Sequence, residues 1–69
     1  MSELREVAQQ MYDEVIKAQN KLLQIGRANP GAYYTGNQEI DSLLLILYTM
    51  QSRLESFLSR LNEEVGQEC

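Results

Sequence analysis

The residue types that carry most enzyme chemistry are scarce in this chain. It has no histidine, so the commonest general base and transition-metal ligand is absent. Its one cysteine is the last residue, Cys69, with no base beside it in the sequence. We therefore expect no cysteine nucleophile, and the covalent chemistry open to Cys69 is a disulfide bond to a second chain.

Two pairs of neighbouring carboxylates remain as candidates for metal binding or acid–base chemistry. They are Glu39 with Asp41, and Glu63 with Glu64. Residues one or two apart on a helix do not face each other, so neither pair builds a metal site alone. The glycines form no phosphate loop, because no Gly-Lys-Ser/Thr string follows them. We predict a protein without enzyme activity, metal or cofactor.

The composition is that of one small folded domain. Of its 69 residues 43% are hydrophobic, which is too apolar for a disordered chain. The net charge of −4 repels a phosphate backbone, so nucleic-acid binding is not expected. The longest apolar run is far below the roughly 18 residues that cross a bilayer, and the first residues lack a signal peptide's hydrophobic region. We expect a cytoplasmic protein with no membrane insertion.

An amphipathic helix is predicted over about residues 3–25. Ser2 is a favourable N-cap, and acidic residues follow it where the helix dipole favours negative charge. Apolar residues then recur at alternating spacings of four and three, which is the heptad pattern: Leu4, Ala8, Met11, Val15, Ala18, Leu22 and Ile25. This pattern predicts a helix that packs along one apolar seam.

A connector of about residues 26–36 is predicted to lead into a second helix over about residues 37–65. Gly26 is expected to end the first helix at the C′ position, where the backbone is left-handed. The candidate caps of the second helix are Asn29, Thr35 and Asn37. A start between residues 35 and 37 is favoured, because glycines would weaken a helix that began at Asn29.

Six consecutive apolar residues, Leu43–Tyr48, dominate the second helix. Successive helix residues point about 100° apart, so six in a row cover every side of the cylinder. Two helices joined by a short connector form an antiparallel hairpin, which covers only one side of this stretch. The sequence therefore predicts an all-α fold with a single domain over residues 1–69, a two-helix hairpin that assembles into a four-helix bundle or a helical hetero-complex.

The function that follows is a non-enzymatic one. We predict an oligomerisation or adaptor protein, chaperone-like in its action, that buries an apolar helix face against a second copy or another helical protein. The expected interface combines seven residues of the second helix with three of the first: Leu43, Ile46, Leu47, Met50, Leu54, Phe57 and Leu61, and Tyr12, Ile16 and Leu23.

The start of the second helix reads Asn37-Gln38-Glu39-Ile40-Asp41, which resembles the Ser-Gln-Glu-Leu-Asp signature of the aspartyl-phosphate phosphatases of the sporulation phosphorelay. Gly26 and Asn29-Pro30 also resemble the Gly and Asp-Pro of that family's connector. In that family two antiparallel helices present the polar residues of the motif to a phosphorylated response regulator. As an alternative function, the resemblance implies a phosphatase whose Gln38, Glu39 and Asp41 face the phosphoaspartate.

The order of a helix, an Asn-Pro bend and a helix with an aromatic and aliphatic middle is similar to a second group. These are the needle subunits of type III secretion systems and their small hairpin chaperones. Proteins of that group work by burying one another's helices. The resemblance implies a needle-like or needle-chaperone-like component as a further alternative.

Overall fold

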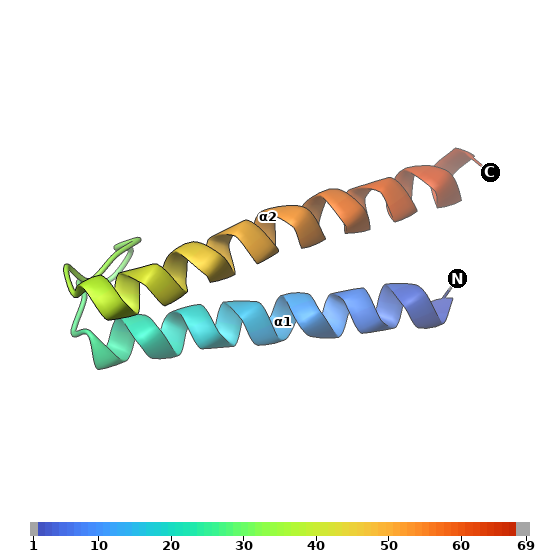
Figure 1. Cartoon of the computed structure of the whole chain (residues 1–69). Coiled ribbons are helices and arrows are strands. Elements are labelled where there is room, and N and C mark those ends of the chain that lie inside the picture. Colours follow the sequence, from blue (N-terminus) through green and yellow to red (C-terminus); the bar gives the residue numbers. More distant parts are fainter. Residues whose placement is uncertain (1, 68–69) are drawn as a thin grey trace.

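The chain folds into two antiparallel α-helices joined by a connector (Figure 1). The computed structural model describes residues 2–67, with side chains from residue 3 to residue 61. Helix α1 spans Ser2–Ile25 and helix α2 spans Gln38–Gln67. No strand occurs among the described residues. The predicted all-α helical hairpin is confirmed, and it forms a rod of 47 × 19 × 17 Å.

Helix α1 ends in a Schellman motif that is displaced by one residue from the predicted one. The backbone N–H of Arg27 donates to the carbonyl of Gln24 at 3.1 Å, and that of Ala28 donates to the carbonyl of Leu23 at 3.0 Å. The residue in the left-handed region is Arg27, with a φ of 55°. The prediction that Gly26 takes this position is wrong, because the helical pattern of hydrogen bonds continues through Gly26.

Gly26 is required for a different reason, which is close packing. A Cβ atom at this position would lie 2.4 Å from Cγ2 and 2.6 Å from Cβ of Thr35. Real Cβ atoms do not approach other atoms so closely, so the side chain of Thr35 occupies the space that any larger residue would need. The end of α1 and the end of the connector are therefore in direct contact.

Asp41, in the first turn of α2, holds this end of the connector in place. Its carboxylate accepts hydrogen bonds from the backbone N–H of Thr35 at 2.7 Å, the hydroxyl of Thr35 at 2.9 Å and the backbone N–H of Gly36 at 3.0 Å. These bonds, the one from the Thr35 backbone above all, hold the pKa of Asp41 below its ordinary value.

Asn37 is the residue that caps α2. Its side-chain oxygen accepts hydrogen bonds from the backbone N–H groups of Glu39 at 3.0 Å and Ile40 at 3.2 Å. Its own N–H donates to the hydroxyl of Thr35 at 3.0 Å. Of the three candidate caps, the structure selects the last, so α2 begins at Gln38.

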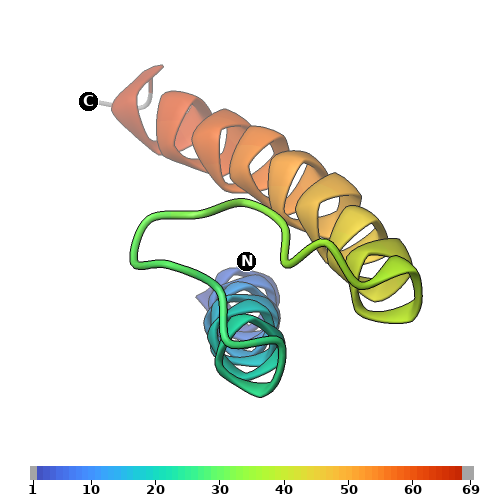
Figure 2. The ribbon, with the colours of Figure 1, turned by 90° about the vertical axis from the view of Figure 1, so that its left-hand side faces the viewer.

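The connector covers one flank of the hairpin, as the view along the helices shows (Figure 2). On this side, which we call the connector flank, the ring of Tyr48 meets Tyr33 and Tyr34 edge to face, with centroids 6.0 Å and 5.7 Å apart. The hydroxyl of Tyr48 donates to the carbonyl of Tyr33. Burial, and then the two neighbouring tyrosines, raise the pKa of Tyr48. The connector thus shelters part of the apolar stretch of α2.

The core between the helices is small. Among the described side chains the buried apolar ones are Ala8, Val15, Leu44 and Leu61, of which only Leu44 is wholly inaccessible. Leu61 lies near the C-terminal end of α2, yet it is only 8% exposed. Helical side chains point toward the N-terminus of their helix, so Leu61 leans back over α1.

A chain of polar side chains crosses the interface between α1 and α2. Gln19 is buried, and its Nε2 donates to Oε1 of Gln51 at 2.7 Å. Gln51 donates in turn to Glu55 at 3.2 Å, and the hydroxyl of Tyr12 donates to the same carboxylate at 2.8 Å. The bond to Glu55 raises the pKa of Tyr12. No buried side-chain polar atom within the described part of the chain lacks a partner.

Candidate functional site

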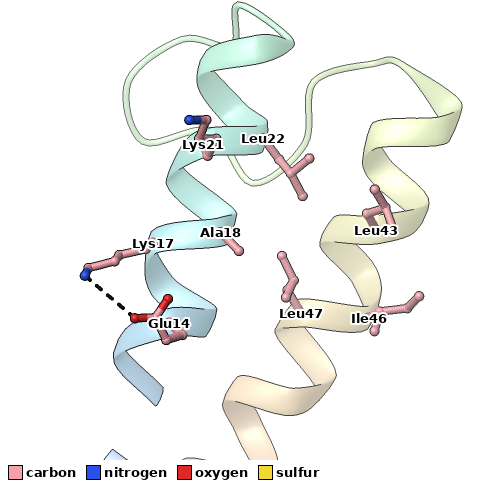
Figure 3. A pocket seen from close by; sticks show the side chains of 8 residues that line it. All are labelled: Glu14, Lys17, Ala18, Lys21, Leu22, Leu43, Ile46 and Leu47. Carbon is pink, nitrogen blue, oxygen red and sulfur yellow. Dashed lines mark ion pairs between the residues drawn. The ribbon is translucent and has the colours of Figure 1, made fainter. Parts of the chain in front are cut away.

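The flank of the hairpin opposite the connector is open and apolar. At the connector end a cavity of about 540 Å³ lies between the two helices. The surface that faces this space is almost wholly apolar, although three of the residues that line it are charged. The lining comes from both helices: Glu14, Lys17, Ala18, Lys21, Leu22, Leu43, Ile46 and Leu47. Figure 3 shows Ala18 and Leu22 of α1 pointing toward Leu47 of α2 across this space.

A second cavity of about 470 Å³ continues along the same flank toward the termini. Its lining is again apolar apart from two residues at the edge: Val7, Gln10, Met11, Glu14, Val15, Leu47 and Met50. The two cavities share Glu14 and Leu47, so they form one continuous feature, which we call the apolar groove. It runs along most of the hairpin.

Charged side chains border the groove on the side of α1. Lys17 lies 3.8 Å from Glu14, and both side chains are about three-quarters exposed. Figure 3 shows Lys17 extending away from the groove and toward Glu14. A pair this exposed contributes little to stability, about 0–1 kcal/mol, so both residues remain available to another chain.

Four of the predicted interface residues of α2 come together in the groove: Leu43, Ile46, Leu47 and Met50. Leu43 and Ile46 are 52% and 56% exposed, which is high for large apolar side chains. The other three lie outside its lining. Leu54 is half-buried, Phe57 is 36% exposed and Leu61 is buried in the hairpin. The α2 wall of the groove therefore contains four of the seven residues that were predicted to form an interface.

The three predicted interface residues of α1 do not line the groove. Tyr12 donates to Glu55, which lies seven residues after Tyr48 and therefore on the connector flank of α2. Ile16 follows Tyr12 by four residues, so it lies on the same side of α1 and is half-buried there. Leu23 lies beside the connector, in a cavity of about 380 Å³ that it lines together with Pro30. The structure thus separates these residues from the exposed face of α2.

Five apolar residues of α1 form that wall of the groove: Val7, Met11, Val15, Ala18 and Leu22. They follow one another at spacings of four, four, three and four, which places them in one row. This spacing could have revealed the row from the sequence. The heptad pattern concealed it, because Met11, Ala18 and Leu22 also belong to the seam that was expected to face α2.

The three residues of the phosphatase signature differ in how they are exposed and bonded. Gln38 and Glu39 are exposed at the start of α2. Both oxygens of Asp41 accept hydrogen bonds from the connector, so this carboxylate faces Thr35 and Gly36. The arrangement gives Asp41 a structural role in joining the connector to α2.

The described part of the chain carries neither a cluster of metal ligands nor a membrane-spanning helix. Among the side chains described, those of residues 3–61, acidic residues do not gather in any group of three or more that could hold a metal ion. Neither described helix combines the length and the apolar character needed to span a bilayer. Comparison with protein-family models, curated proteins and solved structures finds no match to this chain.

Proposed function

We propose that this protein is a non-enzymatic helical module for oligomerisation or adaptor binding, which works by burying its apolar groove against helices of another polypeptide. One observation carries the proposal. The groove exposes more large apolar side chains than the hairpin buries, and it is continuous over both helices. Monomeric soluble proteins rarely leave such a surface in water, and a continuous apolar face is typical of an interaction site.

The energy available supports this function. Five groove residues are between 38% and 56% exposed: Val7, Met11, Leu43, Ile46 and Met50. Full burial of one such side chain contributes about 1.5–3 kcal/mol, so covering their exposed parts contributes roughly 4–7 kcal/mol. Association costs about 4–15 kcal/mol, so a partner must bring an apolar face of similar size. Helices with a matching apolar row meet that requirement.

Two adjacent aliphatic residues of α2, of equal size, provide a matched test. Ile46 and Leu45 are 56% and 57% exposed, but only Ile46 lines the groove. Glutamate at either position should affect an isolated hairpin to the same extent. Ile46→Glu should release any groove partner, because it places a charge in a surface that partner binding dehydrates, whereas Leu45→Glu should not.

The measurement is size-exclusion chromatography of the tagged chain in an extract of its own cells, with the purified chain on the same column. The wild type and Leu45→Glu should elute well above the 7.9 kDa of one chain, and Ile46→Glu should elute as the free hairpin. Equal helical content of the two variants by circular dichroism controls for folding. Elution of all three proteins as free chains in the extract would refute the proposed function.

A further inference from the structure

The charged residues along the two borders of the groove form ordered rows. On α2, Glu39, Ile46, Arg53 and Arg60 are each seven residues apart, so they share one side of the helix with a residue that lines the groove. On α1 the border carries Glu14 and Lys17 near the middle of the helix and Lys21 toward its C-terminus. Glu3, near the N-terminus, lies eleven residues before Glu14 and therefore on the same side. All of these charged side chains are exposed.

Each border changes sign along its length, and the two borders change in opposite directions in space. Because the helices are antiparallel, the end of the hairpin with both termini carries Glu3 of α1 and Arg60 of α2. The connector end carries Lys21 of α1 and Glu39 of α2. At each end, therefore, the border of α1 has the charge that complements the border of α2.

We infer that the partner which fills the groove is a second copy of this chain, placed with its α2 against α1 and with both connectors at the same end. The inference rests on the proposed function and names its partner. A two-fold axis parallel to the helices keeps each residue at its own level along the rod. It therefore brings Glu14 near Arg53 of the second copy, Glu3 toward Arg60, and Lys21, which is level with Leu43–Leu47, to within about one to two helical turns of Glu39. The apolar rows of both copies meet between these borders in a four-helix bundle.

The other face-to-face arrangement brings like charges together at its middle. A two-fold axis perpendicular to the helices packs α1 on α1 and α2 on α2, so the middle of each helix meets its own copy. Glu14 and Arg53 lie near the middles of Ser2–Ile25 and Gln38–Gln67. Glu14 would then meet Glu14, and Arg53 would meet Arg53. This repulsion is confined to the middle, because Glu3 lies toward Lys21 of the second copy in this arrangement. Recovery of Lys21→Glu by Glu39→Lys therefore distinguishes the two arrangements.

The test measures the dimer dissociation constant of the purified full chain by light scattering over a dilution series. Lys21→Glu should weaken the dimer about tenfold. Both copies carry the substitution, so each lost attraction and each new repulsion occurs twice. Adding Glu39→Lys should restore most of the affinity. Arg5→Glu makes the same change in net charge seven residues before Tyr12, on the connector flank, and should have little effect. High salt should shrink the difference between the wild type and Lys21→Glu.

Each outcome has a separate meaning. Weakening by Lys21→Glu without recovery on adding Glu39→Lys would overturn the arrangement, and equal weakening by Arg5→Glu would show that only net charge acts. A purified wild type that stays a single chain at all concentrations would overturn the second copy as partner. The proposed function would still stand in that case if Ile46→Glu released a partner in the extract, and it would fail if the extract showed none.

Discussion

The hydrogen bond between Gln19 and Gln51 offers a quantitative test of how the hairpin is held together. Gln19 is only 7% exposed, and its bond to Gln51, at 2.7 Å, is the one that the structure gives its amide. In Gln51→Leu the amide of Gln19 loses that partner inside the interface. An unpaired buried amide costs about 1–3 kcal/mol, so we expect a loss of that size in the free energy of unfolding.

The double variant sharpens the prediction. Replacing both residues by leucine removes both amides from the interface and substitutes apolar groups of similar size. Such a change is close to neutral or stabilising. We therefore expect the Gln19→Leu/Gln51→Leu protein to unfold with a free energy within about 1 kcal/mol of the wild type, so the two substitutions couple by at least about 1 kcal/mol.

The assay is urea unfolding followed by far-ultraviolet circular dichroism, with all four proteins at one concentration so that any association affects them equally. A double variant that loses the sum of the two single losses would refute the reasoning. That result would mean that water, and not Gln51, supplies the hydrogen-bond partner of the Gln19 amide.

Two further predictions concern the connector. Gly26→Ala should lower the free energy of unfolding by about 1–3 kcal/mol, because the new methyl group overlaps Thr35; in a double-mutant cycle with Thr35→Gly, measured by urea unfolding, most of that loss should disappear, and simple additivity would contradict it. The carboxylate of Asp41 has a pKa below its ordinary value of about 3.8 in the folded state, so its bonds stabilise the fold above that pH and the stabilisation is lost as the pH falls through the lowered pKa. Asp41→Asn should therefore unfold more easily than the wild type near neutral pH, and the gap in urea midpoints should narrow on acidification below pH 3.8; a gap independent of pH would contradict this role.

The hairpin could be predicted from the sequence because its signals are local. Heptad spacing sets the extent of α1, and a stretch of glycines with the only proline interrupts the helical pattern. The last residue of α1 is Ile25, as predicted, but the left-handed residue after it was predicted wrongly, since glycine after a helix usually takes that position. Gly26 serves the contact with Thr35, nine residues later, and a contact of that kind leaves no mark in local spacing.

The groove was only half predictable for a related reason. The apolar excess of α2 identified Leu43, Ile46, Leu47 and Met50, because no single neighbour could cover every side of that helix. On α1 the apolar band is wide, and the sequence does not state which edge the connector covers. The rotation of α1 depends on the buried pair of Gln19 with a residue of α2, and polar residues at such positions interrupt the apolar pattern.

The directions in which Leu43–Tyr48 point around α2 bear on the size of the proposed assembly. Leu44 points into the hairpin and is inaccessible, and Tyr48 packs under the connector. Leu45 points outward and is 57% exposed, and an exposed leucine is ordinary on a protein surface. Under the proposed function, a partner covers the groove side, with Ile46. In the proposed dimer one interface closes on itself about a two-fold axis, so we expect light scattering on the purified chain to level off at two copies.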